Sequence, residues 1–341
     1  MQQALMTRPG VIEYSDAAPA RPGPGEVSIR VRQIGICGSD IHVWHGKHPF
    51  TPYPVIQGHE FAGILEEIGP DTTVSCPIGS LVTAMPQIVC DVCNPCRKGR
   101  FNICENLKVR GFQADGCGRE LFIVPAERLI PLPDSLPLDK AAMVEPVAVA
   151  VHACSRAGDL KGKNVVVLGA GTIGNLIAQV AKANGARSVL ITDMSGYRLS
   201  IARKCGIDYP VDITTRTLKE SVYDIFGGEG FDLAFEAAGA ESSLASAVAA
   251  IEKGGRIMIV GVYGARPVVD MSVVGEHEIT LSGSMMYWRD DWTEAVRLLE
   301  TALSVDALVT RHFTFTQWAD AYRYIDANGP ESMKIMVDMP T

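Results

Sequence analysis

The spacing of hydrophobic positions changes part-way along the chain, and this change predicts two kinds of folding unit. Up to about residue 146, short segments such as 27–31, 61–65 and 120–124 read as strands and are separated by many glycines and prolines. Alternation of apolar and polar residues, clearest at 27–31, is typical of half-buried strands. We therefore expect an irregular, β-rich module in this part of the chain.

From residue 163 onward, continuous apolar runs alternate with segments of helical period. This order of strands and helices produces a parallel sheet that is covered by helices on both faces. The sequence thus predicts an α/β fold with a doubly wound, Rossmann-type sheet. The expected strands are 164–168, 188–193, 231–235 and 256–260, and the expected helices end near Asn184 or begin near Ser195 and Glu241.

The length of 341 residues allows two domains. Beyond about residue 277 the alternation loosens, and one more strand-like segment at 334–338 closes the chain. We expect this last part to return and pack on the first module. The predicted units are a discontinuous unit of residues 1–146 and 277–341, and a continuous unit of residues 147–276.

Composition and charge restrict the possible partners. The chain is 47% hydrophobic, carries a formal net charge of −8 and has no clustered Lys/Arg stripe, which argues against binding to nucleic acid. It shows no secretory leader and no apolar run long enough for a bilayer. We expect a cytoplasmic protein that acts on a small molecule and has no membrane partner.

Residues 169–174, Gly-Ala-Gly-Thr-Ile-Gly, fit the dinucleotide-binding pattern G-x-G-x-x-G. The pattern alone is weak, but here it follows an apolar strand and opens a helix, as the fingerprint requires. Gly169 permits a tight turn, Gly171 lets the backbone approach the pyrophosphate, and Gly174 lets the helix pack closely on the strand. The helix N-terminus offers N–H groups to the phosphates. The predicted cofactor-binding loop consists of Gly169, Gly171, Thr172, Ile173 and Gly174.

An acidic residue at the end of the next strand completes this fingerprint. Asp193 lies about twenty residues beyond the loop, where a carboxylate accepts hydrogen bonds from the ribose hydroxyls and repels a 2′-phosphate. We therefore predict NAD rather than NADP as the cofactor. Arg198 is the one nearby cation that could blur this preference.

Four cysteines, Cys90, Cys93, Cys96 and Cys104, follow the spacing C-x2-C-x2-C-x7-C. Turn-sized gaps of this kind let four thiolates converge on one zinc ion, which is then saturated and has no position for a substrate. An iron–sulfur centre uses similar ligands and is the alternative. We predict a structural zinc.

A second set of metal-binding residue types is scattered in the same module. It consists of Cys37, the neighbours His59 and Glu60, and Glu145. Each of these alone is more often a packed residue than a ligand. Together they offer sulfur, nitrogen and oxygen donors that suit zinc with an open coordination position.

These motifs, in this order, resemble the zinc-dependent medium-chain alcohol and polyol dehydrogenases, in particular the branch that includes sorbitol, L-threonine and sugar-acid dehydrogenases. The resemblance spans nearly the whole chain and implies a GroES-like fold for the β-rich unit and a dimer or tetramer. It also implies a catalytic zinc held by Cys37 and His59, with Glu60 or a water that it orients, and Glu145 at the third protein position. Direct and water-mediated binding by Glu60 and Glu145 both remain open.

The resemblance further implies an oxidation in which zinc acts on the substrate hydroxyl and NAD accepts a hydride. Ser39 and His42 match the family's proton relay, which passes through the cofactor ribose. A histidine suits this role because its pKa lies near working pH. The alternative is that His42 merely fills a surface turn.

A polyol or a sugar acid (aldonate) is the expected substrate. Where sorbitol dehydrogenases carry Arg-Tyr, this chain has Met286 and Tyr287, which puts sorbitol itself in doubt. Arg289 either binds a substrate carboxylate or is a surface residue paired with Asp290 or Asp291. Other candidates are an L-threonine 3-dehydrogenase-like or general secondary-alcohol dehydrogenase, and a non-enzymatic regulatory protein that kept the fold.

Overall fold

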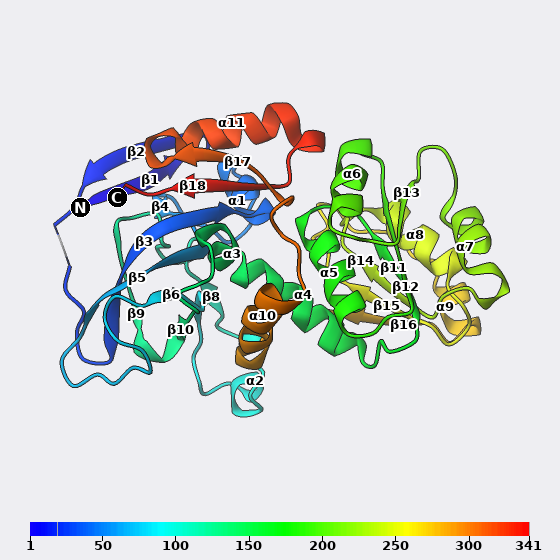
Figure 1. Cartoon of the computed structure of the whole chain (residues 1–341), viewed down its shortest axis with the longest axis horizontal. Helices are drawn as coiled ribbons and strands as arrows, with labels where there is room; N and C mark the ends of the chain where they lie inside the picture. Colours follow the sequence, from blue (N-terminus) through cyan, green and yellow to red (C-terminus); the bar gives the residue numbers. More distant parts are fainter. Residues whose placement is uncertain (19, 341) are drawn as a thin grey trace. The chain divides into compact units, whose positions relative to one another are not determined.

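The computed structural model describes residues 1–18 and 20–340 and divides the chain into two compact units (Figure 1). Unit 1 comprises Met1–Glu145 and the chain from Val309 onward, and unit 2 comprises Pro146–Leu308. Among the described residues, every helix is too short or too polar to cross a membrane.

Unit 2 contains a six-stranded, fully parallel sheet in the order β13-β12-β11-β14-β15-β16. All five residues of the central strand β11 are buried, which explains its continuous apolar run. Strands β11 and β12 have the bounds predicted from the sequence, so the Rossmann-type prediction is confirmed. The strands are β11 (Asn164–Leu168), β12 (Ser188–Asp193), β13 (Tyr209–Asp212), β14 (Leu233–Glu236), β15 (Arg256–Ile259) and β16 (Thr280–Gly283).

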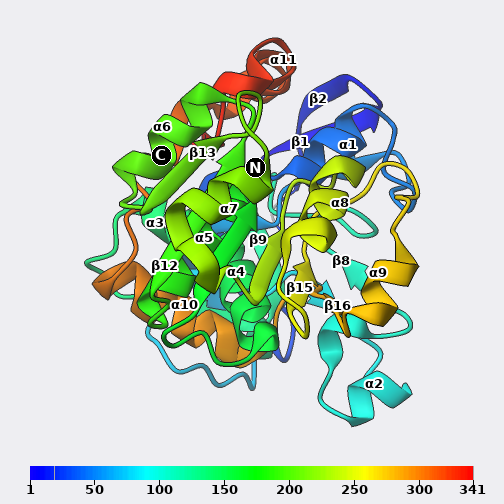
Figure 2. The ribbon, with the colours of Figure 1, turned by 90° about the vertical axis from the view of Figure 1, so that its right-hand side faces the viewer.

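Helices cover both faces of this sheet. Helices α7, α8 and α9 share one buried cluster with the side chains on one face, while α5 and α6 pack on the other (Figure 1). Figure 2 turns unit 2 toward the viewer, with α5 and α6 beside strands β12 and β13. The helices are α4 (Val144–Ala157), α5 (Thr172–Ala183), α6 (Gly196–Lys204), α7 (Leu218–Phe226), α8 (Glu241–Ala250), α9 (Met271–Glu276) and α10 (Arg289–Thr301).

The second boundary between the units differs from our expectation. We placed it at residue 277, whereas unit 2 extends to Leu308. The reason is that β16 adds a sixth strand by pairing in parallel with β15, and α10 follows it. As a short edge strand that is only half-buried in its middle, β16 lacks the apolar run that marks the interior strands.

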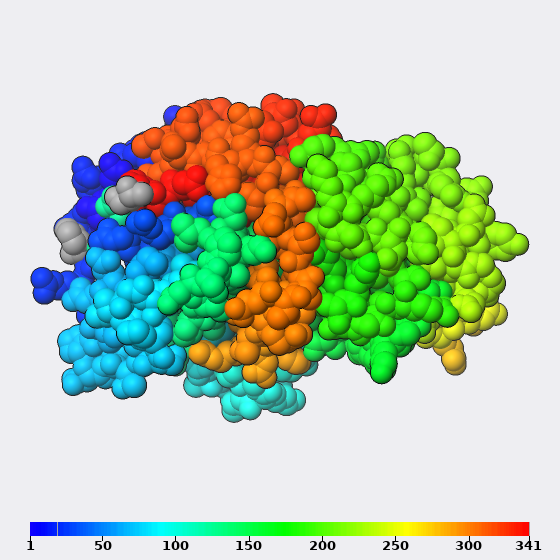
Figure 3. Space-filling view, viewed as in Figure 1, coloured from blue at the N-terminus to red at the C-terminus, as the bar shows by residue number. Residues whose placement is uncertain are grey.

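Unit 1 is built around β3, an 11-residue strand that pairs antiparallel with β5, β9 and β18. The expected return of the chain is therefore present, because β18 lies against β3. In the space-filling view, the red atoms of the C-terminal residues lie against the blue atoms of the N-terminal strands (Figure 3). The seven-stranded sheet has the order β10-β6-β5-β3-β18-β17, with β9 beside β3. The α/β prediction with a separate β-rich unit is confirmed.

Unit 1 contains many short strands and helices in addition to those of its main sheet. Its strands are β1 (Gln2–Arg8), β2 (Val11–Asp16), β3 (Glu26–Ile36), β4 (Val55–Ile56), β5 (Glu60–Ile68), β6 (Leu81–Ala84), β7 (Gln87–Ile88), β8 (Lys108–Val109), β9 (Leu121–Pro125), β10 (Leu129–Pro131), β17 (Val309–Thr314) and β18 (Lys334–Asp338). Its helices are α1 (Gly38–Trp44), α2 (Asn94–Arg97), α3 (Leu138–Ala142) and α11 (Trp318–Asn328). Through Trp318, Ala321 and Tyr322, helix α11 joins the core of the unit.

Candidate metal centres and cofactor loop

Strand pairing brings three of the predicted metal ligands together. Cys37 follows β3 directly, and the β3–β5 register places Gly35 opposite Glu60, the first residue of β5. His59 therefore also lies beside Cys37. One ligand atom from each of Cys37, His59 and Glu60 lies within 4.8 Å of the others, and both His59 and Glu60 are buried. Sulfur, nitrogen and oxygen donors at this separation fit a zinc ion.

A buried ion pair fixes one member of this cluster. Lys334 at the start of β18 donates from Nζ to Glu60 Oε2 at 2.5 Å and to the carbonyl oxygen of Ile36 at 3.0 Å. Burial alone would lower the pKa of Lys334, but the charges of Glu60 and Cys37 raise it above its ordinary value. Lys334 therefore places a positive charge beside the Glu60 carboxylate. A Cβ at Gly35 would lie 2.4 Å from Glu60 Oε2, so only glycine leaves room for this carboxylate.

A second carboxylate faces the imidazole ligand. Asp40 is 1% exposed, and its Oδ1 lies 3.6 Å from His59 Nδ1, which leaves Nε2 as the nitrogen for a metal. Burial lowers the pKa of His59, yet Asp40 and Cys37 raise it well above its usual value. The negative charges that raise this pKa would also attract a metal cation. Asp40 accepts the backbone N–H of Cys37 at 2.9 Å and is held in place by it.

The remaining predicted catalytic residues lie near this cluster without joining it. Glu145 is buried in the first turn of α4, and its carboxylate is not among the three donors that lie within 4.8 Å, although its charge contributes to the raised pKa of Lys334. Ser39 and His42 are three residues apart on α1 and therefore share a face of that helix. His42 is exposed, and the described part of the chain shows no direct hydrogen bond between the two.

The four cysteines of the second predicted site converge in a lobe around α2. The Sγ atom of Cys104 lies 3.5 Å from that of Cys90 and 3.9 Å from that of Cys93. Thiolates at the corners of a zinc tetrahedron with 2.3 Å bonds are separated by about 3.8 Å. The lobe therefore fits a single, fully coordinated ion. All nine cysteines are free thiols, so no disulfide competes for these side chains.

The backbone of the lobe favours thiolates, the form that binds metal. N–H groups of Val92 and Cys93 stabilise the charged form of Cys90 and lower its pKa to about 6. Cys104 Sγ accepts N–H groups from Cys90 at 3.4 Å and from Asn106 at 3.3 Å. For Cys96, burial and the neighbouring thiols raise the pKa to about 12. A cation at the centre of the lobe would offset the unfavourable proximity of the four cysteine sulfur atoms.

The glycine loop lies between β11 and α5 in unit 2. Gly169 has φ +100°, and a Cβ there would lie 3.0 Å from the backbone nitrogen of Ala238. A Cβ on Gly174 would lie 1.8 Å from the carbonyl oxygen of Gly169, which is the close helix–strand contact expected of the third glycine. At Gly171, the N-cap of α5, no atom lies within 4 Å of the Cβ position. Space is therefore left at the helix N-terminus, where Thr172, Ile173 and Gly174 begin the first turn.

Asp193 lies against this loop. Its carboxylate accepts the N–H of Ala170 at 2.8 Å and the N–H of Ser195 at 2.9 Å. A carboxylate has about four acceptor positions, so capacity for ribose hydroxyls remains. Arg198 Nη1 lies 3.9 Å from Asp193 Oδ2. The two residues that we singled out for nucleotide preference are thus neighbours.

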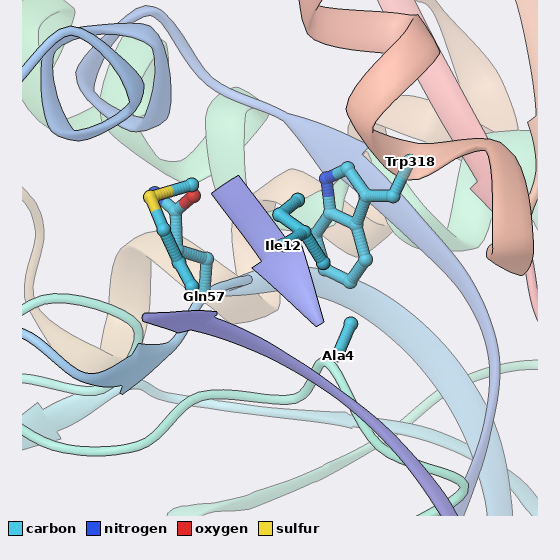
Figure 4. A pocket seen from close by; sticks show the side chains of 5 residues that line it. Ala4, Ile12, Gln57 and Trp318 are labelled. Carbon is cyan, nitrogen blue, oxygen red and sulfur yellow. The ribbon is translucent and has the colours of Figure 1, made fainter. Parts of the chain in front are cut away.

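Several residues that hold the first cluster were not found from the sequence. They are Asp40, Gln57, Tyr322 and Lys334. The position of Asp40 three residues after Cys37, at the start of a helix, was an available signal. Gln57 lies on a small crevice with Ala4, Met6, Ile12 and Trp318 (Figure 4). None of the predicted metal ligands lines this crevice.

Comparison with known proteins identifies the family to which this chain belongs. The model of the family described as "Zinc-binding dehydrogenase" matches residues 172–301, and that of the "Alcohol dehydrogenase GroES-like domain" matches residues 23–134. The L-threonine 3-dehydrogenase of Sinorhizobium medicae is 33% identical over 99% of this chain and 98% of its own. This chain belongs to the zinc-dependent medium-chain alcohol dehydrogenases. The family consists of NAD(P)-dependent oxidoreductases, so the protein is an enzyme.

Solved structures agree with this assignment. A short chain alcohol dehydrogenase from Escherichia coli CFT073, complexed with NADH, has a TM-score of 0.92 at 28% identity and covers 99% of both chains. Galactitol-1-phosphate dehydrogenase from Escherichia coli has a TM-score of 0.91 at 27% identity and covers 99% of this chain and 100% of its own. The chain therefore has the GroES-like fold of this family, and the family uses zinc and a nicotinamide dinucleotide.

Two glycine substitutions in the loop should separate binding from folding. In Gly171→Ala, the new methyl group meets no protein atom at φ −66°, so the melting temperature should be unchanged while NADH binding weakens about tenfold or more. Gly174→Ala forces the helix away from Gly169, so stability should fall by about 1–3 kcal/mol. Thermal melting and NADH fluorescence titration measure both effects. Wild-type NADH affinity in Gly171→Ala would contradict the assigned loop.

Substitution of one cysteine of the lobe should lead to the loss of one zinc ion per chain. Cys104→Ser takes away the sulfur that contacts both Cys90 and Cys93, so we expect one zinc per chain in place of two, together with a lower melting temperature. Elemental analysis after dialysis measures the zinc content. The matched control is Cys76→Ser, a half-buried cysteine outside the lobe, which should retain both ions. Two zinc ions in the Cys104→Ser protein would refute the structural site.

Proposed function

We propose that this protein is a zinc-dependent NAD(H) dehydrogenase that interconverts a secondary alcohol of a polyol or sugar acid with the matching ketone. The observation that carries the proposal is the cluster of Cys37, His59 and Glu60, whose mixed donors leave zinc a position for a substrate oxygen. A closed four-thiolate lobe elsewhere in the chain has a structural role and leaves the chemistry to this cluster. The galactitol-1-phosphate dehydrogenase of similar structure acts on a polyol phosphate.

The residues of the cluster have separate roles in this proposal. Cys37 and His59 would hold the ion, and Glu60 and Glu145 would complete its surroundings directly or through water. The chemistry that zinc and the nicotinamide supply when bound is polarisation of the substrate oxygen and acceptance of a hydride. The protein must then remove one proton. Ser39 and His42 supply the relay, since exposed His42 can deliver the proton to solvent.

The cofactor assignment within the proposal is NAD. Asp193 sits at the loop with acceptor positions to spare, and its negative charge disfavours a 2′-phosphate. For the substrate, Arg289 at the start of α10 is exposed and offers a guanidinium for a carboxylate. A guanidinium of this kind would suit the carboxylate of a sugar acid.

The second candidate is an L-threonine 3-dehydrogenase activity. It is supported by the 33% identity to an enzyme of that name over nearly the full length of both chains. L-Threonine also carries a secondary alcohol and a carboxylate, so it presents the same two groups to the enzyme. A cytoplasmic location and a homo-oligomeric state, either dimer or tetramer, complete the proposal by analogy with such enzymes.

A substrate panel tests the proposal directly. The zinc-loaded protein is mixed with NAD and, in turn, with polyols, polyol phosphates, aldonates, L-threonine and simple alcohols, and the absorbance of NADH is followed, with NADP in parallel. We expect turnover with NAD on a polyol or an aldonate. Turnover confined to L-threonine would select the second candidate. Inactivity on the whole panel with two zinc ions bound would overturn the proposed substrate class.

Substitution of the relay histidine should change both rate and pH dependence. His42→Gln removes the base that takes the proton during oxidation, so kcat should fall by about 100-fold. The loss of rate on acidification that a histidine base imposes should disappear as well. Steady-state kinetics across a pH series measures both, and His312→Gln, an exposed histidine of the same unit, is the control. An unchanged pH–rate profile in His42→Gln would remove this residue from the mechanism.

A further inference from the structure

The returning C-terminal segment contributes a buried chain of side chains that leads to the catalytic metal cluster. Tyr322 on α11 is fully buried, and its hydroxyl donates to Oε1 of Gln57 at 2.9 Å. The amide nitrogen of Gln57 donates to Asp40, at 3.3 Å to its carbonyl oxygen and at 3.4 Å to Oδ1. That same Oδ1 atom lies 3.6 Å from His59 Nδ1. The hydrogen bonds therefore end at Asp40, whose carboxylate faces the predicted ligand His59 at ion-pair distance.

From Tyr322 to Asp40 the donors and acceptors of this chain run in one direction, and the Asp40 carboxylate is the final acceptor. Asp40 is a buried carboxylate and needs donors around it. Gln57 provides one only while its amide nitrogen faces Asp40, because a flipped amide would turn its oxygen toward the carboxylate. The Tyr322 hydroxyl donates to the other end of the amide and so provides a donor for the amide oxygen in this orientation. Hydrogen bonds that run in sequence also polarise and strengthen one another.

Contacts between helices α1 and α11 hold Tyr322 in place. Its ring stacks on Trp44 at the end of α1, with ring centroids 4.9 Å apart and an angle of 15° between the planes. Trp44 Nε1 donates to Asp326 on the same C-terminal helix at 3.3 Å. Helix α1 begins directly after Cys37 and carries Asp40, so α11 is attached to the element that presents both. Because the Tyr322 hydroxyl is held in this way, it can orient the Gln57 amide, which in turn contacts Asp40.

We propose that Tyr322 and Gln57 are positioning residues of the catalytic zinc site, acting on His59 through Asp40. This inference rests on the proposed assignment of Cys37, His59 and Glu60 to that site. Outer partners of metal ligands typically change metal affinity by about 10- to 100-fold when they are removed. Tyr322 stands two side chains away from the ligand, so an effect near the lower end of this range is expected.

The test measures metal release rather than catalysis. Zinc loss from the purified, zinc-loaded full-length protein is followed with a chromogenic chelator, and the phase due to the catalytic site is identified as the one missing in His59→Ala. In Tyr322→Phe, which keeps the ring, this phase should be about tenfold faster, and the phase of the cysteine lobe unchanged. The visible spectrum of the cobalt-substituted protein should shift as well, because the ligand field at the metal changes. Tyr324→Phe, on the same helix with its ring against Phe313, is the control and should match wild type.

A double-substitution cycle separates positioning from a general loss of stability. Gln57→Leu should accelerate the same phase, and the double variant with Tyr322→Phe should be no faster than Gln57→Leu alone, because Tyr322 acts only through Gln57. Wild-type release and an unshifted cobalt spectrum in Tyr322→Phe would overturn the inference, even if the melting temperature falls. Independent, multiplying effects of the two substitutions would also overturn it. If His59→Ala still bound two zinc ions, the proposed catalytic site would fail instead.

Discussion

The pairing of strand β3 with β5 and β18 is the constraint on which the rest of unit 1 depends. Its register sets Glu60 opposite Gly35 and brings Ile335 of the last strand opposite Ile36, one residue before Cys37. A slip of one residue would turn these side chains to the other face of the sheet. Three segments that are far apart in sequence are thus brought to one point by backbone hydrogen bonds alone. The side-chain chemistry is added to a geometry that the sheet already determines.

Charge balance at this point follows from burial. Asp40 and Glu60 are each 1% exposed, and an unpaired carboxylate in such surroundings would be costly. Lys334 offsets one of them, and the N–H of Cys37, the amide of Gln57 and the imidazole of His59 surround the other. A divalent cation would add a charge opposite to those of Asp40, Glu60 and the thiolate form of Cys37, so the same arrangement can serve both stability and metal binding.

The sequence was sufficient for those features that are encoded locally. The parallel sheet, the glycine loop with Asp193 and the four-cysteine lobe each occupy a continuous stretch with its own spacing rule. Long-range partners could not be found in this way: Lys334 is 274 positions from Glu60, and Tyr322 is 265 positions from Gln57. Nothing in a single sequence links such pairs, and a buried lysine is unusual in itself. The boundary at Leu308 was missed for a related reason, because an edge strand such as β16 shows no apolar run.

The discontinuity of unit 1 imposes an order on its assembly during synthesis. A chain emerges from the ribosome N-terminus first, and its domains generally fold as units. The cysteine lobe, which is contained between Cys90 and Cys104, can acquire its metal while later segments are still being made. Strand β18 and helix α11 arrive only after all of unit 2 has been translated. A chain that stops early would therefore contain every proposed metal ligand and the complete nucleotide fold, yet lack Lys334 and Tyr322, the side chains that reach the proposed catalytic cluster from the last strand and helix.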